Sequence, residues 1–469
     1  MIPARVRWFG ALALLAGAGA WLALGGARAA RPDILLVVWS GSRADRLSAY
    51  GYARDTTPWL RSFASEAVLF REAFTPCPWA APARATLFTG LLPLQHGLRQ
   101  GAGDRVAPGI PLLAETLRDA GYETVGFNAD ELVGPGTGLE AGFDRMVPLS
   151  LGDSAGGRAD RVLESVEAWL RERRNAPNGA RKPLFLFVNF TDMHLPRRPP
   201  PEDLAAIAGG PAIAPPLERA LRVDPLDAVG HLLGVRKLDD EAVAAMGTVY
   251  DASARFLDRS TGRLVEMLRK DALRADPVIA VVSDHGDHLG EHGHLGHEFS
   301  LFEGVLRIPM VIRWPGKFEG GRVESAQVRL QDLYPTLLDA ARVPVPAKTG
   351  LDAITLAETP LRPRLLRATF HRPTGFLAEA KVAFPGAPAE AFRPFLVSIF
   401  GIREPAAPGA RGPLKFMLYA SREGDAPPVT QRELLYDLRG DPDERENLVE
   451  RGRKGDLADA ERLRAMIIR

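Results

Sequence analysis

Three short, mainly apolar runs stand out along the chain, at residues 33–38, 183–190 and 278–282. Their β-branched and aromatic residues follow one another without regular polar alternation, which is typical of strands buried on both faces of a parallel sheet. Other stretches repeat apolar residues at helical spacing. These helical stretches are residues 60–67, 111–120 and 161–170. The alternation predicts an α/β fold, with a large mixed but mainly parallel sheet sandwiched by helices.

The pattern changes near residue 345, beyond which Pro, Ala and Arg become more frequent. Residues 415–418 and 433–438 have the composition of strands in a small antiparallel sheet. We therefore expect an α/β domain at residues 31–345 and a small C-terminal α+β subdomain, built on an antiparallel sheet, at residues 346–469.

The first 29 residues have the pattern of an export segment. Arg5 and Arg7 precede an apolar stretch at residues 8–24, and residues 27–29 form a small-x-small cleavage signal. A stretch of roughly 17 residues is short for a membrane span. We therefore favour a cleaved signal peptide at residues 1–29 and keep an uncleaved membrane anchor as the alternative. Either reading predicts an exported protein, periplasmic or extracellular, or one anchored to the membrane by this segment.

Charge and cysteine content exclude two classes of protein. Lys and Arg total 59 against 58 for Asp and Glu, so the formal net charge is +1. The lack of a basic excess argues against nucleic acid as the main partner. The single cysteine, Cys77, excludes an internal disulfide framework, and a hydrophobic content of 46% is ample for a large core without one.

Candidate chemistry lies where the third apolar run ends. Asp284 and His285 follow this run directly, at the carboxyl end of a strand, where open α/β sheets bind their ligands. A carboxylate and an imidazole suit zinc or manganese, and the carboxylate also suits calcium. Five of the nine histidines lie between His285 and His297. An isolated Asp-His pair would be read as part of a polar surface loop, but this pattern favours a functional site.

This stretch resembles a known family. Ser-Asp-His-Gly at residues 283–286, Leu-Gly-Glu-His-Gly at 289–293 and Arg-Ile-Pro at 307–309 are similar to the metal-binding strand and loop of the sulfatases. Sulfatases belong to the alkaline-phosphatase-like superfamily of metal-dependent sulfate and phosphate ester hydrolases. The resemblance implies that Asp284 and His285 occupy metal-ligand positions. It also implies a substrate-binding role for His297, since many relatives carry there a lysine that contacts the ester anion.

The first apolar run leads into a second part of the family pattern, with one substitution. Residues 43–52 are close to the segment that follows the first strand in sulfatases. The family's metal-binding aspartate, three residues before Arg43, is Ser40 here, and its neighbour is Gly41. A serine hydroxyl brings no charge and is a poor substitute for a carboxylate on a divalent cation.

Residues 74–90 resemble the nucleophile motif of the family. Aligned on Pro82 and on Arg84, the arginine of the motif, the nucleophile position is occupied by Ala80, which offers neither a nucleophile nor a metal ligand. Formylglycine, the modified residue that serves many relatives, is therefore not expected. Cys77 lies three residues too early, about 10 Å of extended chain. A plain helix start after a Pro-rich loop would fit this stretch alone about as well.

The second apolar run ends near Asp192, Met193, His194, Leu195 and Pro196. Sulfatases have a similar Asp-x-His-x-Pro, whose histidine contacts the ester anion, so His194 becomes a candidate catalytic residue. Without that pattern a lone histidine would be read as structural. In all, the resemblance spans residues 33–448, with gaps at 197–245, the region that shapes the substrate pocket in relatives, and at 350–410.

The two substitutions leave three hypotheses. The first is a sulfatase-family hydrolase whose catalysis is reduced or lost, because Ala80 and Ser40 replace the nucleophile and a metal ligand. The second is a non-catalytic extracytoplasmic protein that binds a small sulfated or phosphorylated ligand. The third is a structural role without a ligand site. The histidine cluster favours the first over the third, and the substitutions favour the second over the first.

The same positions bear on the cofactor. A divalent cation such as calcium, zinc or manganese is expected to bind weakly or not at all, because Asp284 and His285 are the only strong ligands placed by the pattern. The expectation changes if His292, His294 or His297 joins them.

Overall fold

The computed structural model describes residues 31–468, except 100–102, 131–133, 135, 150–157, 176–180, 348–350, 407–411 and 422–428. The predicted export segment, residues 1–29, lies outside the described residues. Within the described part of the chain, no helix has both the length and the apolar character needed to cross a membrane.

Eight strands form the large sheet, in the order β12-β2-β11-β7-β1-β6-β4-β5. Their bounds are β1 Ile34–Trp39, β2 Val68–Phe70, β4 Glu123–Asn128, β5 Arg145–Pro148, β6 Leu184–Phe190, β7 Val278–Val282, β11 Met310–Arg313 and β12 Val323–Glu324. The five strands from β7 to β5 are mutually parallel, whereas β11 runs antiparallel to both of its neighbours. The predicted mixed, mainly parallel sheet is therefore confirmed, and all three apolar runs are central strands of it.

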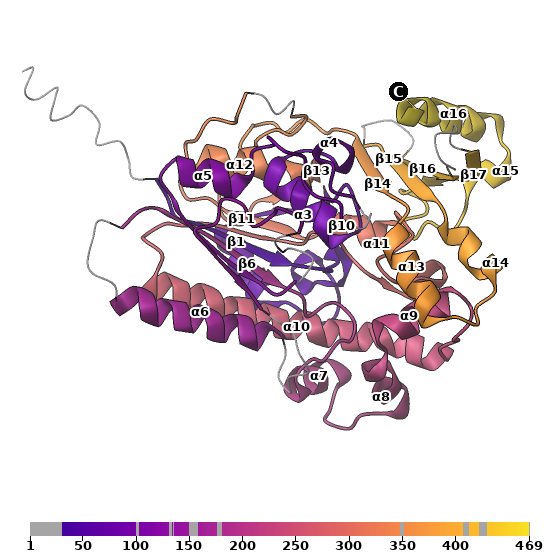
Figure 1. Ribbon diagram of the computed structural model, residues 1–469, viewed down its shortest axis with the longest axis horizontal. Coiled ribbons are helices and arrows are strands. Elements are labelled where there is room, and N and C mark those ends of the chain that lie inside the picture. Colours follow the sequence, from indigo (N-terminus) through magenta and orange to yellow (C-terminus); the bar gives the residue numbers. More distant parts are fainter. Residues whose placement is uncertain are drawn as a thin grey trace, which may run out of the picture.

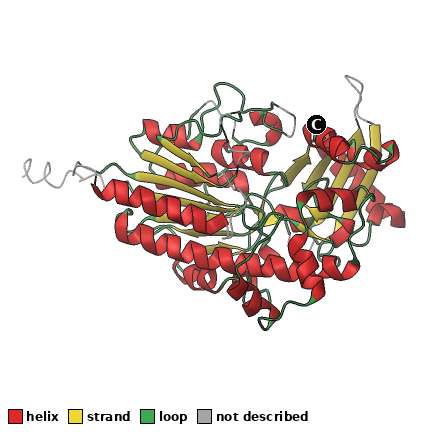
Figure 2. Cartoon of the chain, turned by 60° about the horizontal axis from the view of Figure 1, so that its bottom comes forward, coloured by secondary structure: helices red, strands yellow, loops and turns green. Residues whose placement is uncertain are grey.

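Helices cover both faces of this sheet, as Figures 1 and 2 show. One face is covered by α3 Ala80–Thr89, α5 Leu113–Asp119 and α12 Leu333–Ala340. The other face is covered by α2 Pro58–Phe63, α6 Arg158–Asn175 and α10 Asp240–Asp271. Alternate residues of β1 divide between them: Ile34, Leu36 and Val38 pack in the first layer, and Leu35 and Val37 in the second. Because successive side chains of a strand point to opposite faces, a strand buried on both sides must be apolar throughout.

A second, four-stranded antiparallel sheet lies near the C-terminus, in the order β14-β15-β16-β17. Its strands are β14 Leu366–Phe370, β15 Ser398–Arg403, β16 Leu414–Ser421 and β17 Val429–Asp437, and the helices around it are α13 Thr374–Ala383, α14 Ala389–Phe392, α15 Leu448–Arg451 and α16 Lys454–Ile468. The small C-terminal α+β unit is confirmed (Figure 1). The boundary between residues 345 and 346 stays a prediction.

The region that the sequence pattern left unassigned, residues 197–245, contains three short helices. They are α7 Pro201–Ala208, α8 Pro215–Arg222 and α9 Pro225–Leu232. Each begins with a proline, whose fixed φ and missing N–H suit the first turn of a helix. Leu204 of α7 and Leu217 of α8 pack with Met246 and Val249 of α10.

The α/β domain also contains several short strands and helices. They are β3 Ala73–Phe74, β10 Arg307–Ile308 and β13 Val328–Arg329, which form a three-stranded sheet, β8 His288–Leu289 and β9 Leu295–Gly296, which form a hairpin, and helices α4 Pro93–His96 and α11 Glu303–Leu306.

The strand register brings the candidate residues together. Val38 of β1 lies opposite Val282 of β7, so Ser40 and Asp284, each two residues further on, lie side by side. On the other side of β1, Trp39 pairs with Phe190 of β6, and the Ser40 N–H donates to the Phe190 carbonyl at 3.0 Å. The carboxyl ends of β1, β6 and β7 therefore meet at one edge of the sheet, as parallel order requires.

Candidate active site

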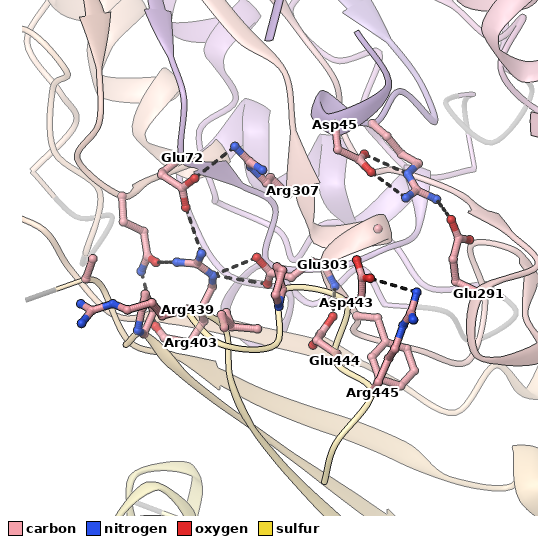
Figure 3. Close-up of a pocket in the computed structure, with 18 of the residues that line it drawn as sticks. Asp45, Glu72, Glu291, Glu303, Arg307, Arg403, Arg439, Asp443, Glu444 and Arg445 are labelled. Carbon is pink, nitrogen blue, oxygen red and sulfur yellow. Dashed lines mark hydrogen bonds and ion pairs between the residues drawn. The ribbon is translucent and has the colours of Figure 1, made fainter. Parts of the chain in front are cut away.

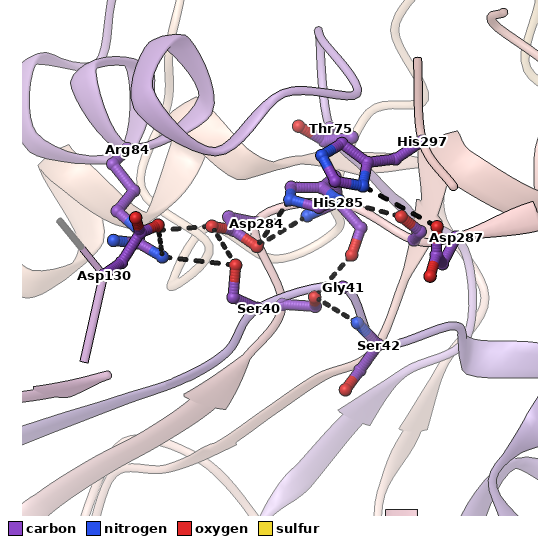
Figure 4. Close-up of polar contacts among 12 residues, drawn as sticks. Ser40, Gly41, Ser42, Thr75, Arg84, Asp130, Asp284, His285, Asp287 and His297 are labelled. Atoms are coloured by element: carbon purple, nitrogen blue, oxygen red, sulfur yellow. Dashed lines mark hydrogen bonds and ion pairs between the residues drawn. The ribbon is translucent and has the colours of Figure 1, made fainter. Parts of the chain in front are cut away.

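The carboxylate of Asp284 is the centre of a buried polar cluster at this edge (Figure 4). Its Oδ2 accepts hydrogen bonds from Ser40 Oγ at 2.9 Å and from Arg84 Nε at 3.1 Å. Its Oδ1 accepts the backbone N–H of His285 at 3.0 Å. Burial opposes ionisation of Asp284, but His285, Arg84 and the Ser40 hydroxyl together hold its pKa below the usual value.

Arg84 reaches this cluster from helix α3 and is fully buried. Its Nη2 donates to Ser40 Oγ at 3.2 Å and to Asn189 Oδ1 at 3.1 Å, and its Nη1 donates to Asn128 Oδ1 at 3.3 Å. Nη2 also lies 3.0 Å from a carboxylate oxygen of Asp130. Together with its bond to Asp284, the planar guanidinium thus contacts polar groups at the ends of four strands, β1, β4, β6 and β7, a role for which its fixed fork of five N–H donors is suited.

The guanidinium of Arg84 lies between Ser40 and Asp284, the two positions that the family resemblance assigns to metal ligands. It bridges Ser40 and Asp284, and the Oδ2 of Asp284 is already bound by both. Neither Ser40 nor Gly41 adds a carboxylate. A hard divalent cation needs several oxygen ligands, and charged ones above all. The residues present therefore fit such a cation poorly between positions 40 and 284, because position 40 brings no carboxylate and the Oδ2 of Asp284 is already bound by Arg84.

Ala80, the predicted nucleophile position, is the first residue of α3. Ala80 follows the N-cap residue Trp79 and is almost fully buried. Cys77 is also buried, and burial raises the pKa of its thiol, which disfavours the nucleophilic thiolate. Ala80 thus lies at a helix N-terminus, one turn before Arg84, where free N–H groups favour an anion. The assignment of Ala80 as the nucleophile position stays a prediction.

Three imidazoles lie beside Asp284. His194 follows β6, His285 follows β7, and His297 follows the short strand β9. The ring centroids of His285 and His297 are 4.3 Å apart, and His194 lies 5.2 Å from the first and 5.1 Å from the second. The Trp79 ring contacts that of His297 edge-on, with 6.2 Å between centroids. The structure therefore brings all seven predicted site residues to one region, and their roles stay predictions.

The three rings differ in charge. Burial lowers the pKa of His285 to about 4 and holds that of His194 well below its usual value, with the neighbouring histidines adding to the effect for His194. Burial also opposes the charged form of His297, but the carboxylates of Glu298 and Asp287 raise its pKa to about 9. At neutral pH, His297 is therefore the cationic member of the three.

Four residues of this region were missed by sequence reasoning. Asn128, Asp130 and Asn189 bind Arg84, and Asp287 pairs with Arg197 and lies beside His297. Asn128 and Asn189 are polar residues at the ends of apolar strands, a signal that could have singled them out.

A cavity of about 830 Å³ lies elsewhere, between the α/β domain and the C-terminal sheet (Figure 3). None of the seven predicted site residues lines it. A group of ion pairs, which we call the junction cluster, lies at this cavity: Glu72, Glu303, Arg403, Lys415 and Glu444. All but Lys415 line the cavity, and Arg403, Lys415 and Glu444 are buried. Despite burial, Arg403 and Lys415 lower the pKa of Glu303.

Comparison with known proteins agrees with this architecture. A choline-sulfatase of Rhizobium meliloti is 26% identical over 328 residues, which are 61% of this chain and 63% of the enzyme, so the match spans just under two thirds of that relative. Among solved structures, the phosphonate monoester hydrolase of Agrobacterium radiobacter superposes with a TM-score of 0.69 at 23% identity, over 93% of this chain and 95% of the other. A third protein, solved in complex with its substrate D-glucosamine-2-N,6-O-disulfate, gives a TM-score of 0.68 at 18% identity, over 92% and 96%.

The sequence model of the sulfatase family matches residues 32–343. This range contains the main sheet, helices α2 to α12 and all seven predicted site residues. Because the match covers most of the chain, the protein belongs to the sulfatase family.

Proposed function

We propose that this protein binds a small sulfated or phosphorylated ligand outside the cytoplasm, and that it has lost or greatly reduced the ester hydrolysis of its family. The observation that carries the proposal is the contact of Ser40 with Asp284, because an uncharged hydroxyl lies where the resemblance implies a second metal-binding carboxylate, and Arg84 bridges the two residues. With Ala80 at the start of α3, the nucleophile of the family mechanism and one ligand of its activating cation are both replaced.

An anion still finds favourable groups in this region. The first turn of α3 offers backbone N–H groups without intrahelical partners, and His297 supplies a positive charge close by. His194 and His297 are only partly buried, so a ligand can reach them. The arginines, lysines and histidines that hold sulfate or phosphate elsewhere work through the same charge-assisted hydrogen bonds. The apolar N-terminal segment supports the extracytoplasmic location.

A second candidate function is slow hydrolysis with water as the nucleophile. It is favoured by the three histidines, since a neutral imidazole can accept a proton from attacking water. The two candidates differ in one measurement, which is turnover by the purified wild-type protein.

The test is a repair experiment on an aryl sulfate and an aryl phosphate. The wild type, Ser40→Asp, Ala80→Thr and the double variant are assayed with added zinc, manganese or calcium. The double variant is expected to gain at least ~100-fold in hydrolysis over either single variant, because a nucleophile and its activating cation act as one unit. Ala81→Thr, which adds the same hydroxyl one residue further along α3, serves as the matched control for Ala80→Thr.

Turnover by the wild type equal to that of the double variant would overturn the loss of catalysis. A wild type that neither hydrolyses the esters nor binds sulfate or phosphate in isothermal titration would overturn ligand binding as well.

A further inference from the structure

Three ring nitrogens converge from separate parts of the chain. One nitrogen each from His194, His285 and His297 lies within 4.8 Å of the other two. The three residues follow β6, β7 and β9, so the sheet and the hairpin hold them in place rather than one flexible loop. Groups positioned by rigid elements are the usual basis of a preorganised site.

The hydrogen bonding of His285 identifies which of its nitrogens is free. Its Nδ1 lies 2.8 Å from the carbonyl oxygen of Gly286, which can only accept, so Nδ1 carries the proton. Nε2 then presents a lone pair. Nε2 is buried and has no hydrogen-bond partner among the described residues. A buried polar atom without a partner calls for an explanation, and an absent ligand is one.

Acidic groups flank the free nitrogen and the third ring. Asp284 divides its two oxygens, with Oδ2 bound to Arg84 and Oδ1 3.7 Å from His285 Nε2. The buried carboxylate of Asp287 lies 3.6 Å from His297 Nδ1 and is held in turn by Arg197. The Gly286 carbonyl on His285 Nδ1 and the Asp287 carboxylate beside His297 Nδ1 match the arrangement that orients metal-bound histidines, and the Nε2 of His297 lies 3.7 Å from Glu298.

We propose that His194, His285 and His297 bind one transition-metal cation of the zinc type, on the side of Asp284 opposite to Arg84. Neutral imidazoles suit Zn²⁺, Cu²⁺ and Ni²⁺, whereas Ca²⁺ and Mg²⁺ require oxygen ligands. Zinc–nitrogen bonds of about 2.0–2.1 Å place tetrahedral ligands roughly 3.3 Å apart, so the rings close by small side-chain rotations. Three protein ligands leave a fourth position open, toward the solvent that reaches His194 and His297.

This site does not depend on the proposed loss of catalysis, because neither Ala80 nor Ser40 belongs to it. It also explains how one substitution changes the metal preference. Where many relatives carry a lysine, this chain has the imidazole of His297, which can bind a metal in exchange for its proton. The same region therefore combines a weakened hard-cation site, where Ser40 replaces a carboxylate, with a nitrogen-lined one.

The experiment uses the purified, chelator-treated protein. Zn²⁺, and separately Ca²⁺, is titrated calorimetrically into the wild type, His194→Gln, His285→Gln, His297→Lys and the control His292→Gln, an exposed histidine of the same loop. The wild type is expected to bind one equivalent of Zn²⁺ and no Ca²⁺. Removing a hydrogen-bond partner of a metal ligand costs roughly 10- to 100-fold in metal affinity, so each variant that removes a ligand itself should lose more than this. His292→Gln should keep wild-type affinity.

Cobalt(II) gives a second readout, since its d–d absorption reports coordination without any enzymatic assay. A tetrahedral spectrum is expected for the wild type and for His292→Gln, and its loss for His297→Lys. The proposal is overturned by a wild type that does not bind Zn²⁺, by equal binding in all variants, or by loss of binding in His292→Gln alone. Circular dichroism identifies any variant that fails to fold, and the remaining two ligand variants then decide.

Discussion

The junction cluster and the active-site region are both buried and charged, yet they are built differently. In the junction cluster, Lys415 Nζ lies 2.8 Å from Glu444 and 3.1 Å from Glu303, and Arg403 lies 3.1 Å from Glu303 and 2.9 Å from Glu72. Each carboxyl group there faces a cation, although burial and the nearby Glu303 raise the pKa of Glu444 to about 7. The pairs join β15 and β16 of the C-terminal sheet to α11 and the segment around β3. Such closure is typical of a structural role.

In the active-site region, only some of the buried polar groups have partners. Arg84 is satisfied by five polar partners, but the Nε2 of His285 has none among the described residues. On the side of Asp284 that faces Arg84 the polar groups are therefore satisfied, as in a structural site. On the side that faces the histidines, one nitrogen has no partner. The contrast teaches that a buried charge does not by itself mark function. Unused bonding capacity next to such a charge is the better guide.

Breaking the junction cluster should have the largest effect on stability. Lys415→Met removes a cation that is 1% exposed and leaves Glu303 and Glu444 close together without it. We expect the free energy of unfolding to fall by about 3–5 kcal/mol, the cost of an uncompensated buried charge. Chemical denaturation measures it, with the exposed Lys454→Met as the control. Equal stability of both variants would mean that the cluster is not structural.

Removing Arg84 should lower the free energy of unfolding by less, and added metal should restore part of the loss. Arg84→Met leaves Asp284 with the Ser40 hydroxyl and the His285 N–H, so we expect a loss of about 2–3 kcal/mol. If Arg84 stands in for a cation, millimolar Mn²⁺ or Ca²⁺ should raise the Tm of this variant by binding the folded state.

The wild type and Lys415→Met are the controls for this metal effect, and their Tm should not respond. A Tm rise of equal size in all three proteins would show that the metal acts elsewhere and that Arg84 does not occupy a cation position.

Sequence reasoning predicted the fold because each layer leaves a local signal. The apolar runs at residues 33–38, 183–190 and 278–282 became β1, β6 and β7, since strands covered by helices on both faces must be apolar. Their carboxyl ends were expected to meet, and the register of β1 with β7 brings Ser40 to Asp284.

The contacts of Arg84 could not be predicted in the same way. They join α3 to β4, β6 and β7, so they depend on how distant elements pack and not on any spacing in the chain. The free nitrogen of His285 depends on one backbone carbonyl, which no side-chain pattern encodes. In residues 197–245, by contrast, the signal was present: prolines begin α7, α8 and α9.

The smallest effect is expected from a histidine of the active-site region, compared with a structural one. His96 is buried, its Nδ1 accepts the Leu98 N–H at 3.2 Å, and its Nε2 lies 3.2 Å from Thr86 Oγ1. The ring of His194 makes no hydrogen bond within the described part of the chain and is only partly buried. In metal-free buffer, His194→Gln should therefore change the free energy of unfolding by less than about 0.5 kcal/mol, and His96→Gln should lower it by about 1–3 kcal/mol.

Added Zn²⁺ should distinguish His194→Gln from His96→Gln. A metal that binds only the folded state should stabilise the wild type and His96→Gln but not His194→Gln, because only the last lacks a ligand. Thermal unfolding with and without Zn²⁺ measures the difference. If His194→Gln lowered the free energy of unfolding as much as His96→Gln does without metal, the ring of His194 would belong to a satisfied, structural network. That result would contradict the difference between the junction cluster and the active-site region.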